Sequence, residues 1–166
     1  MIVMSAKIPK ALDTAAMQAE MLKALKSSAK QLLAAHEQVV STWNPPAKFI
    51  LHTETSRLQW TLWVYTLDDR YRWTDKGTKP HQIRAKTPSG LIFKTGYKAK
   101  SKVGGLSPVV GGGRSSGPWI RKQVVNHPGT KARDFTGQIK KRYDPLFRKE
   151  MAAAMFRAAK ASGQGR

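Results

Sequence analysis

The sequence predicts an α+β protein, with a long N-terminal helix, an antiparallel sheet of four to five strands, C-terminal helices and a long glycine-rich basic loop. Apolar residues recur at helical spacing over residues 11–43 and again over 134–160, whereas residues 48–126 contain strand-like runs. Strand runs flanked by helices favour packing of the helices on one face of the sheet. The length of 166 residues suits a single domain over residues 1–166.

The first helix is expected over residues 11–43. Its apolar positions, such as Leu22, Leu25 and Leu32, follow one another at three-, four- and seven-residue steps with lysines between them. Asn44-Pro45-Pro46 ends it, because proline disfavours helical backbone in the residue before it.

Two strands are expected next, over residues 49–53 and 58–66. In the second run Leu58, Trp60, Leu62 and Val64 fall on one face, which is typical of a half-buried strand. Residues 54–57 are expected to connect the two strands as a hairpin. Residues 68–73 then form a short turn or helical piece that leads into Gly77.

A second hairpin is expected from residues 80–86 and 91–97, because Thr87-Pro88-Ser89-Gly90 between them favours a turn. Residues 98–118 contain six glycines and two prolines, so we expect a flexible loop. A strand follows over residues 119–125.

Two C-terminal helices are expected, over residues 135–143 and 145–159. Asp144 stands where an N-cap belongs and Pro145 at the first helical position of the second helix. The apolar face of that helix is expected to carry Leu146, Met151 and Met155.

The charge is distributed unevenly. Residues 1–75 carry nine basic and seven acidic side chains, whereas residues 76–166 carry twenty-one and three. Such a surface favours a polyanion or an acidic protein as partner, and a merely solubilising lysine-rich surface is the plain alternative. Basic residues interleave with Phe93, Tyr97 and Trp119, as a nucleic-acid surface requires. The alternating lysines of residues 98–102 suit contact with phosphates and equally suit an acidic protein groove.

The sequence predicts no enzyme. It has no cysteine, and its four histidines, His36, His52, His81 and His127, are scattered along the chain. We therefore expect no catalytic, metal or cofactor site. His81 and His127 flank matching turns and could meet in space, so a nuclease that uses one of them is a remote alternative. No signal peptide and no apolar run long enough to span a membrane is present, which indicates the cytoplasm as the place of synthesis.

Two short phrases stand out: residues 77–81, Gly-Thr-Lys-Pro-His, and residues 127–131, His-Pro-Gly-Thr-Lys. Their glycines are expected in tight turns with positive φ, where the threonine hydroxyl caps the backbone. From Lys76 to Arg133 the chain has thirteen Lys or Arg residues and no Asp or Glu.

These phrases, together with Leu91-Ile92-Phe93 between them and the aromatic approach from Tyr71 to Trp73, resemble the minor tail-component family of long-tailed bacteriophages. The resemblance covers residues 65–160. Members of the family are tail-completion or head–tail connector proteins. The motif residues that the resemblance marks as turn or interface positions are Gly77, Thr78, Pro80, His81, His127, Pro128, Gly129, Thr130 and Phe135.

The resemblance implies a structural virion protein of the head–tail junction. It implies a ring of identical subunits, hexameric by expectation, around the DNA channel, between the head-side connector and the tail terminator or tube. Contact with DNA is expected to phosphates only, because base-specific contacts would hinder sliding. We expect residues 98–117 to be an assembly arm. Basic residues expected to face the channel or a partner are Arg84, Lys86, Lys98, Lys100, Lys102 and Arg114. The alternative function is that of a small basic nucleic-acid-binding protein of the cytoplasm.

Overall fold

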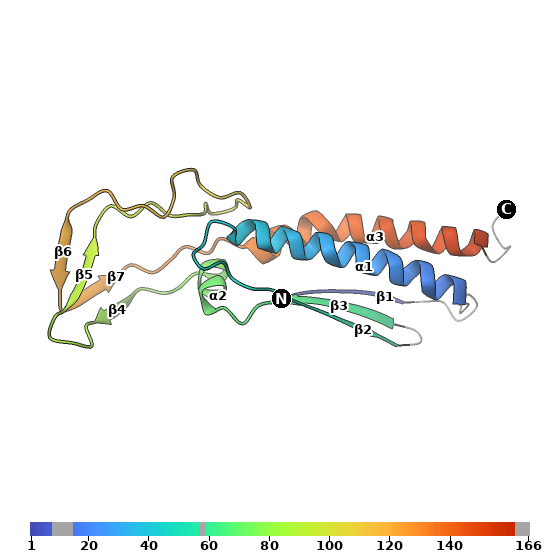
Figure 1. The fold of residues 1–166 in the computed structure, drawn as a ribbon, viewed down its shortest axis with the longest axis horizontal. Coiled ribbons are helices and arrows are strands. Elements are labelled where there is room, and N and C mark those ends of the chain that lie inside the picture. Colours follow the sequence, from blue (N-terminus) through green and yellow to red (C-terminus); the bar gives the residue numbers. More distant parts are fainter. Residues whose placement is uncertain (8–14, 57–58, 162–166) are drawn as a thin grey trace. The chain divides into compact units, whose positions relative to one another are not determined.

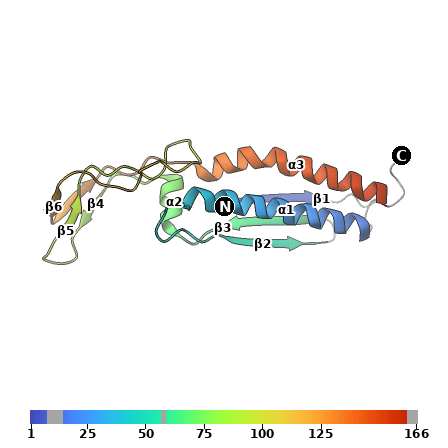
Figure 2. The same ribbon diagram turned by 45° about the horizontal axis from the view of Figure 1, so that its top comes forward.

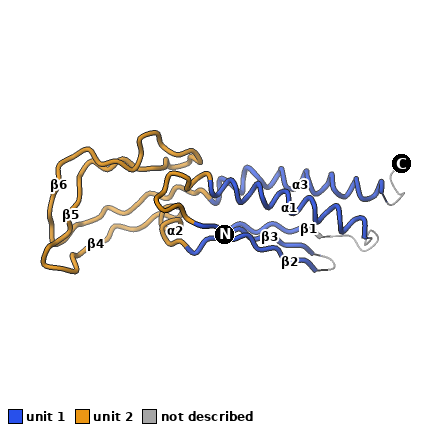
Figure 3. Tube along the Cα trace, in the orientation of Figure 1, with its two compact units in different colours: residues 1–37, 48–67, 136–166 blue, residues 38–47, 68–135 orange. Residues whose placement is uncertain are grey.

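The computed structural model describes residues 1–7, 15–56 and 59–161. The chain forms two compact units, which we describe separately (Figure 3). Unit 1 comprises residues 1–37, 48–67 and 136–166, and unit 2 comprises residues 38–47 and 68–135. Three helices and seven strands, all paired antiparallel, occur among the described residues, which confirms the α+β class.

Unit 1 contains a three-stranded sheet in the order β1 (Ile2–Lys7), β3 (Gln59–Tyr65) and β2 (Ile50–Thr55). The expected hairpin of β2 and β3 is confirmed, and Trp60, Leu62 and Val64 are buried as predicted. Leu58 lies outside the described residues. The sequence analysis missed β1, in which Ile2 and Met4 are buried opposite Val64 and Leu62. A strand of this length offers too few alternating positions to stand out without its partner.

Two long helices, α1 (Ala15–Val40) and α3 (Phe135–Ala161), lie side by side over one face of this sheet, as expected (Figures 1 and 2). The predicted helix end at residue 43 is wrong, because α1 ends at Val40 and a turn follows in which the Trp43 amide donates to the Val40 carbonyl. The predicted start at residues 11–14 lies outside the described residues. Buried positions of α1 include Met17, Met21, Leu25 and Leu32.

The prediction of two C-terminal helices is wrong, because α3 runs without interruption through Pro145. Asp144 is no N-cap, and its carboxylate pairs with Arg148 one turn later at 2.9 Å. Proline in a helix interior costs about 3 kcal/mol. Packing outweighs that cost, since Phe147, Met151, Ala154 and Ala158 are all buried at helical spacing. Of the predicted apolar face, Met151 is buried as expected, whereas Leu146 is half exposed and Phe147 takes its place in the core.

Unit 2 has a small aromatic core around α2 (Asp69–Lys76), which confirms the expected helical piece before Gly77. The ring of Tyr71 lies 5.9 Å from that of Phe135 and 6.5 Å from that of Trp43, measured between centroids. Phe135 is fully buried. Asp68 caps α2, because its carboxylate accepts a hydrogen bond from the Arg70 amide at 2.9 Å.

The rest of unit 2 is built of two two-stranded ladders (Figure 1). β4 (His81–Arg84) pairs with β7 (Val124–His127), and β5 (Leu91–Lys94) pairs with β6 (Trp119–Lys122). The predicted hairpin of residues 80–86 with 91–97 is therefore wrong, and so is the single sheet of four to five strands. The turn itself exists, since the Gly90 amide donates to the Thr87 carbonyl at 3.1 Å. This turn is a bulge in one side of a longer hairpin, whose two sides contain β4 with β5 and β6 with β7.

We call residues 77–131 the ribbon, because its two sides pair almost throughout. One register runs from the Thr78–Thr130 bridge through β4 and β7 to Ala85, whose amide donates to the Gln123 carbonyl. Residues 86–90 loop out, and pairing resumes in β5 and β6. Beyond them, residues 98–118 form no strand but still contain the bridge of Ser101 with Pro108. That this segment is flexible stays a prediction.

Candidate assembly site: the paired Gly-Thr turns and the ribbon

The two Gly-Thr phrases lie directly opposite each other at the base of the ribbon. The Thr78 amide donates to the Thr130 carbonyl at 2.9 Å, and the Thr130 amide donates to the Thr78 carbonyl at 3.1 Å. The Thr130 amide also lies 3.0 Å from the Thr78 hydroxyl oxygen, which accepts from it. The threonine hydroxyl was expected to cap its own turn. Instead the hydroxyl of Thr78 accepts from the amide of Thr130, on the other side of the ladder.

Glycine is required in both phrases for two physical reasons. Gly77 and Gly129 have φ angles of 75° and 84°, a region that other residues rarely adopt. A Cβ on Gly77 would also collide with the carbonyl oxygen of Thr130, and one on Gly129 with that of Thr78. The expectation of positive φ is confirmed, and the close approach explains why the two phrases resemble each other.

His81 and His127 are brought together in the same ladder, with ring centroids 5.0 Å apart. The Nδ1 of His81 lies 2.9 Å from the Lys79 carbonyl oxygen, so it donates. The Nδ1 of His127 accepts a hydrogen bond from the Gly129 amide at 3.1 Å. Both side chains therefore support their own turns, and among residues 1–7, 15–56 and 59–161 no group of three potential metal ligands occurs.

The remaining motif residues have different surroundings. Pro80 and Pro128 are exposed on the two sides of the ladder. Phe135 is buried in the aromatic core, so its side chain offers no surface to a partner in this conformation. The chain between Thr130 and Phe135 is fixed to α2, since the amide of Arg133 donates to the Thr74 carbonyl and that of Asp134 to the Asp75 carbonyl, each at 3.0 Å.

Burial along the ribbon is minimal. Residues 77–131, all of them described, contain one buried side chain, that of Ser101 at 7% exposure. Large apolar side chains are exposed instead, including Ile92 at 53%, Tyr97 at 63% and Trp119 at 66%. An isolated two-stranded ribbon is marginally stable in water, so a ribbon of this kind gains stability when a partner covers it.

The six basic residues singled out from the sequence do not share one environment. Arg84, Lys86, Lys98, Lys102 and Arg114 are exposed. Lys100 is only half exposed, and its Nζ donates to the carbonyl oxygen of Thr42 at 3.1 Å. The Gly104 amide also donates to the Arg133 carbonyl, at 3.4 Å. The glycine-rich end of the ribbon therefore folds back onto the part of unit 2 that contains Thr42 and Arg133.

The sequence singled out Trp119 among basic residues but not the mixed surface that it forms with Ile92, Lys94 and Arg121 on β5 and β6. Lys94 stands opposite Trp119 and Ile92 opposite Arg121 on one face of this ladder, and all four are exposed. The Nζ of Lys94 lies 5.3 Å from the centroid of the Trp119 ring. The alternation of side chains within β5 and within β6 was visible in the sequence. The register that places residues of β5 opposite residues of β6 was not.

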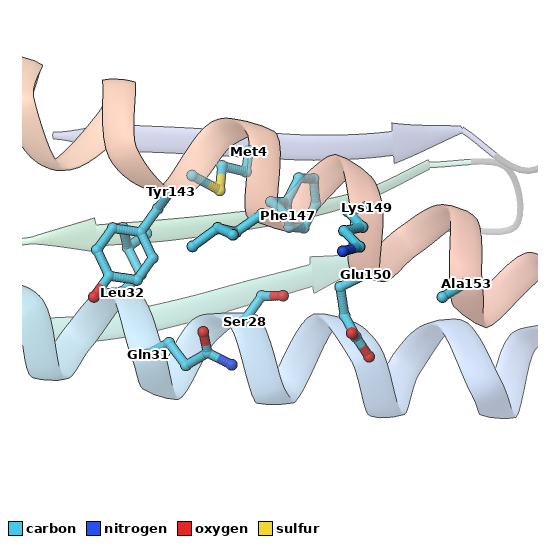
Figure 4. A pocket seen from close by; sticks show the side chains of 10 residues that line it. Met4, Ser28, Gln31, Leu32, Tyr143, Phe147, Lys149, Glu150 and Ala153 are labelled. Carbon is cyan, nitrogen blue, oxygen red and sulfur yellow. The ribbon is translucent and has the colours of Figure 1, made fainter.

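Among the cavities of the described residues, one from each unit is relevant to these features. The cavity of unit 2 has a volume of about 290 Å³ and is lined by residues from both sides of the ribbon, from α2 and from the segment after α1. The cavity of unit 1, about 230 Å³, lies between α1 and α3 over Met4 of β1 (Figure 4). Its polar lining includes Ser28, Gln31 and Glu150, and the carboxylate of Glu150 also pairs with Arg157 at 3.4 Å.

Comparisons with known proteins give no identification, because no family model, no curated protein and no solved structure matches the chain. Among the described residues, no helix is both long and apolar enough to cross a membrane.

Proposed function

We propose that this chain is a structural protein of the head–tail junction of a long-tailed bacteriophage, with no catalytic role. In this proposal several copies form a ring, hexameric by analogy with the family it resembles, around the DNA channel. The ring joins the head-side connector to the tail terminator or tube, and the protein resides in the virion. The observation that carries the proposal is the ribbon, which is long, basic and almost without buried side chains.

The energetics of the ribbon support an assembly role. When the ribbon folds, its backbone exchanges hydrogen bonds with water for hydrogen bonds across the ladder, and the net gain in free energy is small. The ribbon has almost no apolar core whose burial could offset the loss of chain entropy. Exposed Ile92, Tyr97 and Trp119 supply apolar area that a neighbouring protein can cover. Burial contributes about 25 cal/mol per Å² of such area, so covering a few of these side chains stabilises the ribbon by several kcal/mol.

The charge of the ribbon supports the proposed position around DNA. Its basic side chains, apart from the partly buried Lys100, are exposed to solvent, and no acidic residue occurs from Lys76 to Arg133. Contacts of lysine and arginine with phosphates are independent of base sequence and release counterions. A ring lined by them would hold DNA while permitting it to slide.

Shortening the ribbon and examining phage particles tests this proposal. Tyr97 and Ser115 form a bridge, so residues 98–114 can be replaced with an Asn-Gly turn that closes the ladder there. We expect the variant to remain folded but to yield separate heads and tails, and a label on the intact protein to appear at the neck. Normal joining by the shortened protein, or complete particles without the label, would contradict the proposal.

Charge reversal tests the role of the basic side chains separately. R84E/K86E changes two exposed ribbon residues, and K26E/K30E changes two exposed residues of α1 by the same amount. We expect the first variant to lower the yield of joined particles and to weaken salt-sensitive DNA binding more than the second. Equal effects would mean that net charge, and not the ribbon surface, is responsible.

The alternative, a nucleic-acid-binding protein, is favoured by the mixed surface of β5 and β6. An exposed Trp119 beside Lys94 and Arg121 offers a stacking surface next to cations. A protein of this kind would bind single-stranded DNA alone, with an affinity that falls steeply with salt, and W119A would cost about 1–3 kcal/mol per stacked base. A joining protein would instead require its protein neighbours for function.

A further inference from the structure

We propose that the cavity of unit 2 receives a carboxylate side chain, Asp or Glu, presented by a protein partner. The cavity is formed where four separate segments converge. Its principal lining residues are Trp43, Arg70, Tyr97, Lys100, Ser101 and Arg133. Its volume of about 290 Å³ exceeds by far the roughly 30 Å³ that a water molecule occupies in the liquid.

The charge of the lining determines the class of ligand. Arg70, Lys100 and Arg133 are cationic, all three are partly buried, and no lining residue carries a carboxylate. Outside the lining, the carboxylate of Asp68 offsets the charge of Arg70, whose Nε lies 3.0 and 3.1 Å from its two oxygens, so Lys100 and Arg133 supply the remaining positive charge of the lining. An anion is therefore the ligand that this lining favours, because partly desolvated cations interact strongly with it.

Lys100 provides the exchangeable contact. Its Nζ donates to a neutral acceptor, the Thr42 carbonyl, at 3.1 Å. An ammonium group has three N–H donors, so a carboxylate can be added to or exchanged for this contact. The present contact joins an ion to a neutral acceptor, whereas a carboxylate adds the attraction of an opposite charge at a partly buried site, which favours the exchange.

The shape and the aromatic lining favour a protein side chain over duplex DNA. Phosphates of a duplex lie on a convex surface and meet protruding cations, whereas these cations line a hollow between Trp43 and Tyr97. A nucleotide would have to leave its stack to enter, at a cost of a few kcal/mol. An acidic side chain with an aromatic or aliphatic neighbour enters without that cost and covers the exposed Tyr97 ring.

This inference deepens the proposed function by naming the chemistry of a partner at the junction. The two can fail independently, because the pocket is tested with peptides on the purified protein and joining is tested in particles. Loss of the pocket would leave the exposed ribbon faces available for assembly.

The experiment titrates the intact protein with the peptide acetyl-Glu-Glu-Tyr-Glu-Glu-amide, with the Trp43 indole N–H and the amide of Ser101 as NMR reporters. The uncharged probe is acetyl-Gln-Gln-Tyr-Gln-Gln-amide. K100Q removes the pocket ammonium, K100R retains the charge, and K98Q is the matched control. Lys98 has the same charge and also donates to a backbone carbonyl, that of Val110 at 3.1 Å, but it does not line the cavity.

We expect saturable shifts of both reporters with the glutamate peptide and none with the glutamine peptide. K100Q should weaken binding about tenfold or more, the usual worth of a hydrogen bond between charged groups. K98Q should change it less than about twofold, as expected for a screened charge at the surface, and K100R should retain it.

Equal weakening by K98Q and K100Q would overturn the proposal, because the peptide would then follow net charge alone. Absence of reporter shifts, or equal shifts with the glutamine peptide, would overturn it as well. An oligothymidylate that shifts the Trp43 indole and depends on Lys100 more than on Lys98 would assign the pocket to a nucleotide, which also rejects a protein carboxylate as its ligand.

Discussion

Thr78 and Thr130, far apart in the sequence, exchange both of their backbone hydrogen bonds at the base of the ribbon. The exchange fixes the register of β4 with β7, because a slip by one residue would turn each side chain of these strands to the opposite face. The two Gly-Thr phrases are thus one structural element made of two pieces.

The glycines beside these threonines should be sensitive to substitution. G129A combines strain at positive φ with a collision against the Thr78 carbonyl, whereas G104A, also at positive φ, meets nothing within 4 Å. Strain alone costs about 1–3 kcal/mol, and the collision adds to it. We expect G129A to accelerate hydrogen exchange of the Thr78 and Thr130 amides strongly and G104A to leave it nearly unchanged. Similar exchange in both variants would show that the close approach contributes nothing.

His127 should act as a hydrogen-bond acceptor and not as a catalytic base. H127A leaves the Gly129 amide without its partner, which costs about 1 kcal/mol, whereas H127N offers a side-chain oxygen in a similar place. Exchange of the Gly129 amide should therefore be faster in H127A and largely restored in H127N.

A nuclease assay tests whether His81 or His127 has a catalytic role. We expect the purified protein to leave DNA intact with divalent metal present, and H81A and H127A to behave alike. Cleavage by the wild-type protein that either substitution abolishes would favour the enzymatic alternative over the structural one.

Acid should weaken α2 through its N-cap. The Arg70 guanidinium, which hydrogen-bonds Asp68, holds the pKa of this carboxyl below its usual value. A lowered folded-state pKa means that the stabilisation is present above the unfolded value of about 3.9 and is lost as the pH falls through the folded value. Hydrogen exchange of α2 measured near neutrality and at acidic pH should show this loss in the wild type and a smaller one in D68N. An unchanged pH dependence in D68N would contradict this role.

Pro145 should be replaceable with a gain in stability. P145A restores an amide to the interior of α3, and we expect the free energy of unfolding to rise by about 1–2 kcal/mol, less than the full helical penalty because alanine also frees the unfolded chain. Thermal unfolding measures the effect, and A153P, which adds a proline at another interior position, should lower stability. A less stable P145A would mean that the proline contributes packing that outweighs the missing hydrogen bond.

Local patterns predicted much of unit 1 and little of the pairing in unit 2. The spacing of Leu25 and Leu32 predicted α1, and the alternation of Trp60, Leu62 and Val64 predicted β3, since both depend on a buried face that each element carries by itself. Pro145 misled because local propensity was outweighed by burial of Ile139 and Phe147 on either side of the supposed break.

The ribbon could not be predicted in the same way, since both of its sides carry weak apolar patterns. Gln123 illustrates the difficulty: its carbonyl accepts from Ala85 and its side chain donates to the Pro88 carbonyl, and no nearby residue indicates either contact. The sequence did indicate that His81 and His127 could meet in space. Each of them borders one of the two matching turns, and that match relates two residues far apart in the sequence. Lys94 and Arg121 belong to the surface around Trp119 through register alone, so they were missed.

A ladder without a core has no fixed length. The dimensions of unit 1 are set by side chains that interlock, but β4 and β7 contain no buried side chain, so one residue can be added to or removed from each of these two strands without opening a cavity in a core. Each such pair changes the reach by about 3.3 Å. The reach of this segment is therefore a property that evolution or design can adjust in small steps while the core of unit 1 stays the same.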